Sequence, residues 1–365
     1  MTVFFSAGEA SGDAYAAELA NAIRAKQPYA KFKGIGGPRS RAAGIEVLID
    51  STKWGAIGII ESLKVVPRVF SNYWMARKLL EKETGLFIPI DFGFVNVKLA
   101  QHAKKLGWKV LYFIPPGSWK RGPQGRDLPQ ATDAIVTPFP WSAEALNEAG
   151  ANAHFFGHPL VEMTQRSAVG GERKGIALLP GSRMHEVKYN LPVIAEAVKD
   201  LDEELCFGVA ASLDPAELEK SWTELGGKKA TYFPSAAEAL SHARAAIVCS
   251  GTATLEAALC KTPSVVIYVS SKAAEIEYKI RKPKFTWVSL TNILLNRTVV
   301  PELIQWDAKP EKVRELVVGL LNEGSEDRKY QFEAFDDLRE QFGGGQVFAQ
   351  TAEIAAKLLE KPVTA

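Results

Sequence analysis

The sequence predicts an α/β protein with two mostly parallel β-sheets, each covered by helices on both faces. Short apolar runs alternate with amphipathic stretches of helical length along the whole chain, a pattern typical of β-α units. The length of 365 residues suggests two domains. The alternation is interrupted by the polar, glycine-containing segment Thr164–Lys174, which is the best candidate for a linker between them.

In the first half, strands are predicted where runs of β-branched, aromatic and aliphatic residues end at glycine, proline or polar residues. These runs are Val3–Ser6, Phe32–Ile35, Phe87–Ile90, Val110–Ile114 and Ala134–Thr137. Helices are predicted where apolar residues recur at helical spacing, over Ala14–Ala25, Val69–Glu83 and Val97–Leu106. Strands joined by such crossovers are expected to be parallel.

A second β-α series begins at Gly175. Its predicted strands are Ala177–Leu179, Leu205–Val209, Ala230–Phe233, Ala246–Val248 and Ser264–Tyr268. Helical patterns close the chain, and the Gly343–Gly345 run interrupts them before a last helix at Gln350–Leu359. The simplest arrangement is two Rossmann-like, doubly wound domains facing a cleft, because ligands bind at the carboxyl ends of parallel strands.

We expect an N-terminal domain over residues 1–163 and a C-terminal domain over residues 164–345. The last helix, at about 346–365, is expected to pack back on the first domain.

Composition argues against several classes of function. The net charge of +2 does not suggest nucleic-acid binding, although residues 51–130 carry 13 Lys and Arg against 5 Asp and Glu. Three cysteines without paired spacing indicate reduced thiols, and no His/Cys cluster suggests a metal site. No apolar run approaches the roughly 20 residues that span a bilayer. Met1 leads directly into a strand-like run without a basic leader, so we expect a cytoplasmic protein.

Two glycine turns carry the strongest functional signal. Leu178–Arg183 and Cys249–Glu256 each follow a predicted strand and open a predicted helix. Backbone N–H groups at the positive end of a helix bind phosphate oxygens well, so two such turns suggest a diphosphate. Neither turn ends in the Gly-Lys-Ser/Thr of a nucleotide-hydrolysing phosphate loop. A nucleotide held as a leaving group therefore fits better than ATP hydrolysis.

Each residue of these turns has a plainer alternative. Arg183 either contacts the diphosphate or forms a surface ion pair, whereas Glu186 is better explained as a capping carboxylate. Ser250–Thr252 either cradles phosphate or forms an ordinary strand-to-helix turn. Glu256 either binds ribose hydroxyls or faces solvent from its helix.

The first domain offers a third glycine turn and an isolated carboxylate. Ser6–Asp13 follows the first strand but lacks the spacing of a dinucleotide-binding loop. Asp91 stands immediately after the Phe87–Ile90 strand, where it serves either as a general base or as a helix N-cap. Asp200–Asp202 resembles a metal-binding motif of some sugar-transfer enzymes, but a solvated acidic turn explains it better.

In the Trp54–Leu80 region, aromatic and aliphatic residues are interleaved with lysine and arginine. Such a mixture suits a surface that dips into lipid headgroups, but on composition alone a core helix with a basic outer face explains it better.

Several motifs together resemble those of lipid-A-disaccharide synthases, inverting glycosyltransferases of the two-Rossmann (GT-B) type. In the first half they are Ser6–Asp13, Gly34–Arg39, Gly55–Glu61 and Phe156–Leu160. In the second half they are Leu178–Arg183, Ser250–Glu256, Val288–Ile293 and Pro301–Gln305. The combination of the opening and closing motifs is specific, although any one piece is weak.

The resemblance implies a reaction and assigns residues to it. UDP-2,3-diacylglucosamine donates its sugar to the 6-hydroxyl of 2,3-diacylglucosamine-1-phosphate (lipid X), and UDP leaves. Asp91 corresponds to the catalytic carboxylate of the family. Acceptor-side residues are expected to be Glu9, Ser11, Asp13 and Asn96. UDP is expected to be held by Gly181, Ser182, Arg183, Ser250, Gly251, Thr252, Glu256, Asn292, Glu302 and Gln305. No metal or cofactor is expected, because preset donors can meet the charge that develops on the diphosphate.

The same resemblance implies a peripheral position on the inner face of the cytoplasmic membrane, through Trp54–Leu80, and suggests a homodimer. Two departures from the family pattern bear on the acceptor: Phe94 replaces a motif aspartate, and Pro115–Arg121 retains one of two tryptophans. A related GT-B transferase with another lipid or envelope acceptor, or a degenerate nucleotide-sugar-binding protein, is therefore the alternative.

Overall fold

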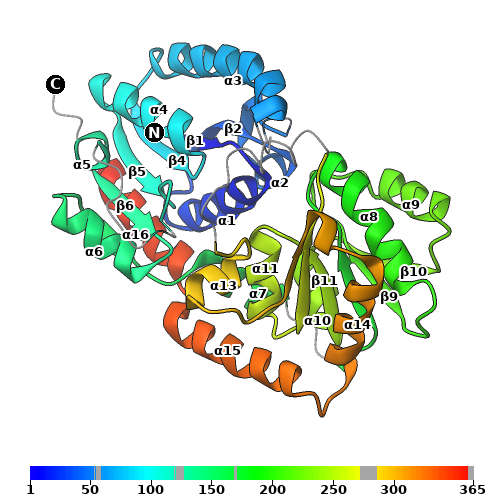
Figure 1. Cartoon of the computed structure of the whole chain (residues 1–365). Helices are drawn as coiled ribbons and strands as arrows, with labels where there is room; N and C mark the ends of the chain where they lie inside the picture. Colours follow the sequence, from blue (N-terminus) through cyan, green and yellow to red (C-terminus); the bar gives the residue numbers. More distant parts are fainter. Residues whose placement is uncertain are drawn as a thin grey trace. The chain divides into compact units, whose positions relative to one another are not determined.

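The computed structural model describes residues 1–52, 54, 59–118, 120, 127–167, 171–271 and 286–360 (Figure 1). The chain forms two compact units of similar size. Unit 1 comprises Met1–Pro159 and Gly344–Ala365, and unit 2 comprises Leu160–Gly343. The chain therefore leaves unit 1 after Pro159, close to the predicted boundary at 163, and returns to it at Gly344.

Unit 1 contains a seven-stranded sheet in the order β3-β2-β1-β4-β5-β6-β7, and every neighbouring pair is parallel. The strands are β1 (Thr2–Ala7), β2 (Lys31–Gly36), β3 (Glu46–Asp50), β4 (Gly85–Ile90), β5 (Lys109–Phe113), β6 (Ala134–Thr137) and β7 (Ala153–Phe155). The central strands are almost entirely buried, as expected for a parallel sheet with both faces covered.

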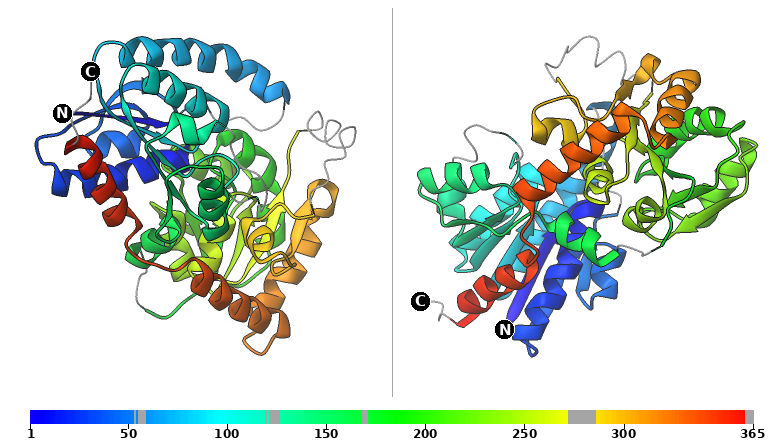
Figure 2. Two further views of the ribbon diagram at one scale, coloured as in Figure 1. Left: turned by 90° about the vertical axis from the view of Figure 1, so that its left-hand side faces the viewer. Right: turned by 90° about the horizontal axis from the view of Figure 1, so that it is seen from below.

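The helices of unit 1 cover both faces of this sheet (Figure 1). They are α1 (Ala10–Lys26), α2 (Pro38–Ala42), α3 (Ile59–Leu80), α4 (Gly93–Lys105), α5 (Leu128–Ala131), α6 (Pro140–Glu148) and α16 (Val347–Glu360). The last helix of the chain packs beside α1, as the two views in Figure 2 also show. Its Phe348 is buried against Phe113 of β5, with ring centroids 6.0 Å apart.

Unit 2 contains a six-stranded parallel sheet in the order β10-β9-β8-β11-β12-β13. The strands are β8 (Ile176–Leu179), β9 (Leu205–Gly208), β10 (Ala230–Phe233), β11 (Ala245–Cys249), β12 (Ser264–Tyr268) and β13 (Glu302–Ile304). The described helices are α7 (Pro159–Ser167), α8 (Met184–Val198), α9 (Pro215–Glu224), α10 (Ala236–His242), α11 (Thr252–Leu259), α13 (Leu290–Leu295), α14 (Pro310–Leu321) and α15 (Glu326–Phe342), with a 3₁₀ turn at Gln305–Asp307.

The linker prediction for Thr164–Lys174 is wrong for residues 164–167, which belong to helix α7 of unit 2. Helix α7 continues through Ser167, and its Arg166 pairs with Glu162 one turn earlier. Further along, Arg173 donates to the carbonyls of Cys260 and Lys261 at distances of 2.6 and 3.0 Å, which ties the segment to the end of α11. The segment was predicted to be a linker because polar residues on the exposed face of a short helix have the same composition as a loop, and the sequence alone does not separate the two.

Candidate functional site

In each sheet, the predicted motifs follow the two central strands between which the direction of the strand order reverses. In unit 1 the Ser6–Asp13 turn follows β1 and Asp91 follows β4, and these strands are neighbours. In unit 2 the two phosphate-type turns follow β8 and β11, which are also neighbours. Ligands of open α/β sheets bind at such switch points. Each unit therefore presents its predicted residues at its own switch point.

Asp91 lies at the start of a turn of unusual backbone conformation. Asp91, Phe92 and Gly93 have φ angles of 45°, 52° and 27°, a region that side chains other than glycine rarely adopt. The N-cap of α4 is Phe92, with no side-chain capping bond, so Asp91 is not a helix cap. Strain of this kind concentrates at functional sites and must be held by the surroundings.

Asn96 holds this turn from below. It is fully buried, and its Nδ2 donates to the carbonyls of Ser6, Ile90 and Asp91 at 2.9 to 3.0 Å. Its Oδ1 accepts a 2.6 Å hydrogen bond from the Ser6 hydroxyl. One amide thus joins the ends of β1 and β4 to the turn. Asn96 was predicted on the acceptor side, and its visible role is to position Asp91.

Sequence reasoning missed a second support of the turn, Tyr112. This residue of β5 is fully buried, and its hydroxyl donates to the carbonyl of Asp91 over 3.0 Å. Burial, and secondarily the nearby Asp91 charge, raise the pKa of the phenol well above its usual value, so it remains a donor. The strand itself was predicted, but no pattern in the sequence indicates where the hydroxyl points.

Replacing Tyr112 with phenylalanine is expected to lower kcat about five- to tenfold with little change in KM. The substitution removes one hydrogen bond, worth about 1 kcal/mol, from the turn that carries Asp91. Steady-state kinetics of UDP release measure the effect. Tyr73→Phe, a change of the same type on α3, is the control. An unchanged kcat in Tyr112→Phe would mean that Asn96 alone fixes the turn.

The turn after β1 approaches Asp91 closely. A Cβ atom at Gly8 would lie 2.1 Å from the Phe92 ring, so any other residue would displace the turn. Glu9, half-buried at the N-cap of α1, adds a second negative charge. Burial, and secondarily the Glu9 charge, raise the pKa of Asp91 to about 6, although the Phe92 N–H opposes the shift. A carboxylate with a pKa near 6 is poised to accept a proton at neutral pH.

This pKa sets the expected pH dependence. Because the predicted general base Asp91 accepts a proton only when it is ionised, kcat/KM is expected to fall as the pH drops below about 6. Glu9→Gln removes a charge that raises the pKa of Asp91, so it should move this acidic limb to lower pH. Glu46→Gln, at an exposed position on β3, should leave the limb in place. A limb that does not move in Glu9→Gln would contradict this coupling.

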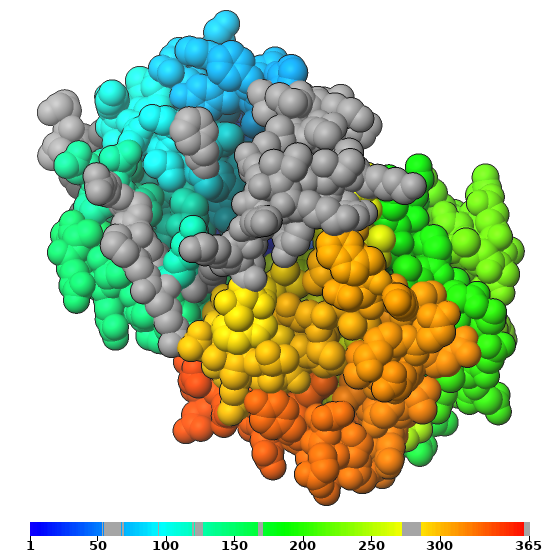
Figure 3. Space-filling view, viewed as in Figure 1, coloured from blue at the N-terminus to red at the C-terminus, as the bar shows by residue number. Residues whose placement is uncertain are grey.

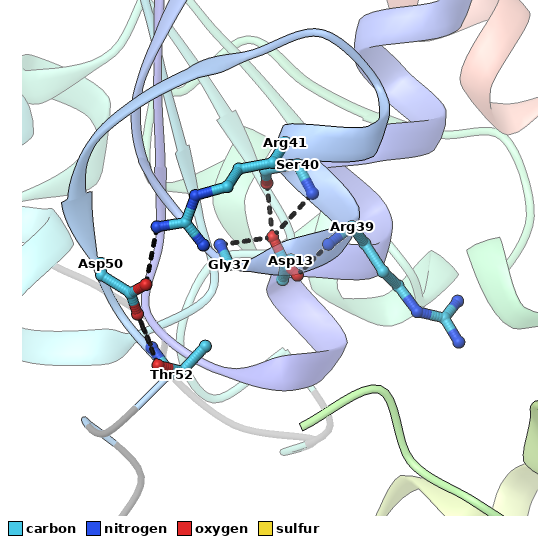
Figure 4. Close-up of polar contacts among 7 residues, drawn as sticks. All are labelled: Asp13, Gly37, Arg39, Ser40, Arg41, Asp50 and Thr52. Carbon is cyan, nitrogen blue, oxygen red and sulfur yellow. Dashed lines mark hydrogen bonds and ion pairs between the residues drawn. The ribbon is translucent and has the colours of Figure 1, made fainter. Parts of the chain in front are cut away.

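Asp13 has a different visible role from the one that its motif suggested. Its carboxylate is buried and accepts hydrogen bonds from the backbone N–H groups of Gly37, Arg39 and Ser40, and from the Ser40 hydroxyl (Figure 4). It therefore fixes the loop between β2 and α2. Ser11 lies half-buried in the first turn of α1.

In unit 2, the turn after β8 is occupied by a carboxylate of its own helix. Glu186, 5 % exposed in its side chain, accepts from the Ser182 N–H over 2.8 Å and pairs with Arg183 over 2.6 Å. The capping role predicted for Glu186 is confirmed. One amide of this predicted phosphate cradle is thus already used, and Arg183 is held at the turn.

The turn after β11 leaves more donors available. Gly251 is exposed, has a φ of 148° and has open space where a Cβ would stand. The Ser250 hydroxyl is fixed by the Val288 carbonyl at 2.9 Å. In the part of unit 2 that the structure describes, no hydrogen bond is found for the N–H groups of Thr252 and Ala253. This N-terminus of α11 therefore has the geometry for an anion, and Glu256 lies half-buried further along the same helix.

The C-terminal motif residues form a network beside this turn. Fully buried Asn292 donates to the Val300 carbonyl and to Glu302, and accepts from the N–H groups of Val299 and Val300. Glu302 also accepts from the N–H groups of Val288 and Ser289. Gln305 exchanges two hydrogen bonds with Ser270. These side chains shape the loop whose Val288 carbonyl holds Ser250.

Parts of three quoted motifs lie outside the described residues: Gly55–Gly58, Trp119, Arg121 and the side chains of Ile59–Glu61 and Phe94. Within the described ranges, no group of three His, Cys, Asp or Glu side chains could hold a metal ion.

Comparison with known proteins decides the family. A family model described as lipid-A-disaccharide synthetase matches residues 3–357. The chain belongs to the lipid-A-disaccharide synthase family. It is 33% identical over 373 residues to the lipid-A-disaccharide synthase of Myxococcus xanthus, covering 97% of this chain and 96% of the relative. It is 35% identical over 332 residues to that of Neisseria meningitidis serogroup B, covering 84% and 85%.

Solved structures agree on the fold of this lipid-A-disaccharide synthase family member. MurG of Acinetobacter baumannii matches with a TM-score of 0.53 at 15% identity, covering 98% of this chain and 99% of that one. The calicheamicin glycosyltransferase CalG4 matches with a TM-score of 0.60 at 13% identity, covering 99% of each chain. The predicted GT-B fold is confirmed, and the chain is a glycosyltransferase of lipid A biosynthesis with lipid-A-disaccharide synthase activity.

Proposed function

We propose that the enzyme joins UDP-2,3-diacylglucosamine to the 6-hydroxyl of 2,3-diacylglucosamine-1-phosphate, with release of UDP and inversion at the anomeric carbon. The observation that supports this proposal best is Asp91, a carboxylate with a pKa raised to about 6, held in a left-handed turn at the switch point of unit 1. No metal or cofactor takes part in the proposed reaction.

Asp91 is the general base in this mechanism. Its carboxylate accepts the proton of the acceptor hydroxyl while the hydroxyl oxygen attacks the anomeric carbon of the donor. Tyr112 and Asn96 hold the Asp91 carbonyl, which fixes the start of the turn. Glu9 and Ser11 lie in the neighbouring turn and are proposed to contact the acceptor, while Asp13 positions the β2–α2 loop.

Unit 2 is proposed to bind UDP and stabilise it as it leaves. The backbone at Ser250–Thr252 meets the diphosphate at the N-terminus of α11, where negative charge is favoured. Gly181, Ser182 and Arg183 form the second diphosphate contact, with Arg183 turning from Glu186 toward the ligand. Glu256 is proposed to bind the ribose. Asn292, Glu302 and Gln305 support the adjoining loop.

The decisive test is to incubate the purified protein with UDP-2,3-diacylglucosamine and lipid X in detergent, and to detect UDP and the disaccharide phosphate by mass spectrometry. Both products are expected. UDP without disaccharide would mean that the sugar passed to water, and release that increases with another lipid acceptor from a panel would then identify a related transferase. UDP binding without any release would indicate a degenerate sugar-nucleotide-binding protein.

We also propose that α3 brings the enzyme to the inner face of the cytoplasmic membrane. No helix in the described ranges has the length and apolar character to cross a bilayer. Helix α3 instead lies on the outside of unit 1 (Figure 3), with Phe70, Trp74 and Met75 exposed by 60%, 46% and 47%. Arg77 stacks over the Trp74 ring at 4.9 Å. Exposed aromatics beside a cation suit an anionic lipid surface. The homodimer stays a prediction.

Replacing both Phe70 and Trp74 with serine is expected to weaken binding to anionic phospholipid vesicles roughly tenfold or more, because two large apolar side chains lose their burial in lipid. Cosedimentation with vesicles measures this. Tyr29→Ser, at a position 94% exposed in the turn between α1 and β2, controls for the loss of any exposed aromatic. Equal binding of the double variant and the unchanged protein would exclude α3 as the contact.

A further inference from the structure

The first turn of α2 in unit 1 presents an arginine, Arg39, whose backbone is fixed and whose side chain has no hydrogen bond or ion pair among the described residues. The Arg39 N–H donates to Asp13 over 2.9 Å, within the cluster that also holds Gly37 and Ser40. Figure 4 shows the Arg39 side chain directed away from this cluster. Its neighbour Arg41 instead pairs with Asp50 over 2.6 Å. The hydrogen bonds to Asp13 thus fix the backbone of Arg39 at the start of α2 without using its side-chain charge.

The Arg39 guanidinium has no hydrogen bond or ion pair among the described residues, although the side chain is half-buried. Positive charge dominates this part of the chain, since residues 31–41 contain four Lys and Arg and no Asp or Glu. A partly desolvated guanidinium without an anionic partner is unfavourable, and a bound anion relieves that cost.

Arg39 lines a groove of about 640 Å³ between α1 and α2. A second arginine, Arg24, stands further along it, anchored to the Ala43 carbonyl at 2.7 Å, and Glu18 is the one carboxylate in the lining. The remaining walls are mainly alanines of α1, of the end of α2 and of the turn that follows it, and these small side chains leave the space open. The volume lies within the usual range for small-molecule sites, and the lining carries more positive than negative charge.

The position of Arg39 relates it to Asp91. Strands β2 and β4 lie on either side of β1, and neighbouring strands are about 4.8 Å apart, so the two strand ends are separated by about 10 Å. Both residues follow the carboxyl ends of their strands. A sugar that offers a hydroxyl to Asp91 and carries a phosphate at its opposite end, within reach of a long arginine side chain, matches this separation.

We propose that Arg39 binds the phosphate monoester of the acceptor sugar and thereby determines the preference for a phosphorylated acceptor. This inference rests on the proposed function. Guanidinium groups suit phosphate because they donate two parallel hydrogen bonds to its oxygens. The phosphate of a membrane phospholipid has the same chemistry, so the test is made in detergent micelles without phospholipid.

The experiment compares the unchanged enzyme, Arg39→Gln and Arg41→Gln with two acceptors, 2,3-diacylglucosamine-1-phosphate and its dephosphorylated form. Arg39→Gln should raise KM for the phosphorylated acceptor about 10- to 100-fold, leave kcat similar, and leave KM for the dephosphorylated acceptor unchanged. Arg41→Gln, which breaks a solvent-exposed ion pair, should behave like the unchanged enzyme. Thermal unfolding should show that Arg39→Gln is folded, since the Arg39 guanidinium has no hydrogen bond or ion pair to the residues that the structure describes.

Two results separate this inference from the proposed function. If the unchanged enzyme turns over the phosphorylated acceptor and Arg39→Gln retains the same preference between the two acceptors, Arg39 does not recognise the phosphate. If the unchanged enzyme releases UDP with neither acceptor, the proposed function fails, and the inference fails with it. Arg39→Lys keeps the positive charge but cannot form the two parallel hydrogen bonds of a guanidinium. A KM for the phosphorylated acceptor between those of the unchanged enzyme and Arg39→Gln would support a role for both charge and bidentate geometry.

Discussion

Asp91→Asn is expected to lower kcat by about 10²–10⁴-fold, because a positioned general base contributes about that much to a proton transfer. The asparagine retains the size of the side chain, and the supports of the turn are backbone and neighbouring groups that the change does not remove. UDP affinity should therefore be unchanged. Stopped assays of disaccharide formation measure kcat, and calorimetry with UDP measures the affinity.

Arg183→Ala is the matched counterpart in the other unit. It should weaken UDP binding while leaving Asp91 in place, because Arg183 is the N-cap of α8 in the turn proposed to hold the diphosphate. If both variants lost UDP affinity equally, the division of base and nucleotide contacts between the two units would be wrong. The residual activity of Asp91→Asn should also lose the acidic limb assigned to Asp91.

Asn292→Ala is expected to reduce the free energy of unfolding by about 3–5 kcal/mol. The substitution leaves the N–H groups of Val299 and Val300 and the carbonyl of Val300 without their side-chain partner in a buried region, and each unsatisfied group costs about 1–3 kcal/mol. The melting temperature of unit 2 should fall by about 10 °C. Differential scanning calorimetry of the unliganded protein measures this.

The same variant should weaken UDP binding, because Asn292 and Glu302 hold the loop whose Val288 carbonyl fixes Ser250. Asn152→Ala, which removes one exposed hydrogen bond to the Asp133 carbonyl, should change the melting temperature by no more than about 2 °C. A stable Asn292→Ala protein that nevertheless lost UDP would place Asn292 in direct contact with the nucleotide instead.

Much of the fold was predictable because parallel strands are buried on both faces and are therefore continuous apolar runs. Strands β1, β4 and β8 follow this rule. The short edge strands β3, β7 and β13 were not predicted. Glu46–Asp50 is mostly exposed or half-buried and mixes charged with apolar residues, so its sequence resembles that of a loop. Edge strands receive their definition from pairing with a neighbour, which local sequence does not encode.

The site was predictable as a set of positions but not as a set of roles. The rule that ligands gather at strand ends placed Asp91 and the turn at Ser250 correctly on switch-point strands. The rule does not distinguish side chains that are free to contact a ligand from side chains whose hydrogen bonds fix the conformation of the loops. Asp13, Asn96 and Asn292 are buried with their polar atoms already engaged. Tyr112 was missed because its contribution lies in the direction of one hydroxyl.

The return of α16 to unit 1 has a consequence for biosynthesis. Phe348, Ala352 and Ala355 are buried, and α16 packs on α1, which is among the first segments to be translated. Unit 2 can thus complete its core during translation, whereas α1 still lacks the helix that packs against it. Unit 1 therefore reaches its final packing only after the ribosome has released the last helix. A premature stop codon near residue 345 should leave apolar surface of α1 exposed, so that the truncated protein aggregates or is degraded.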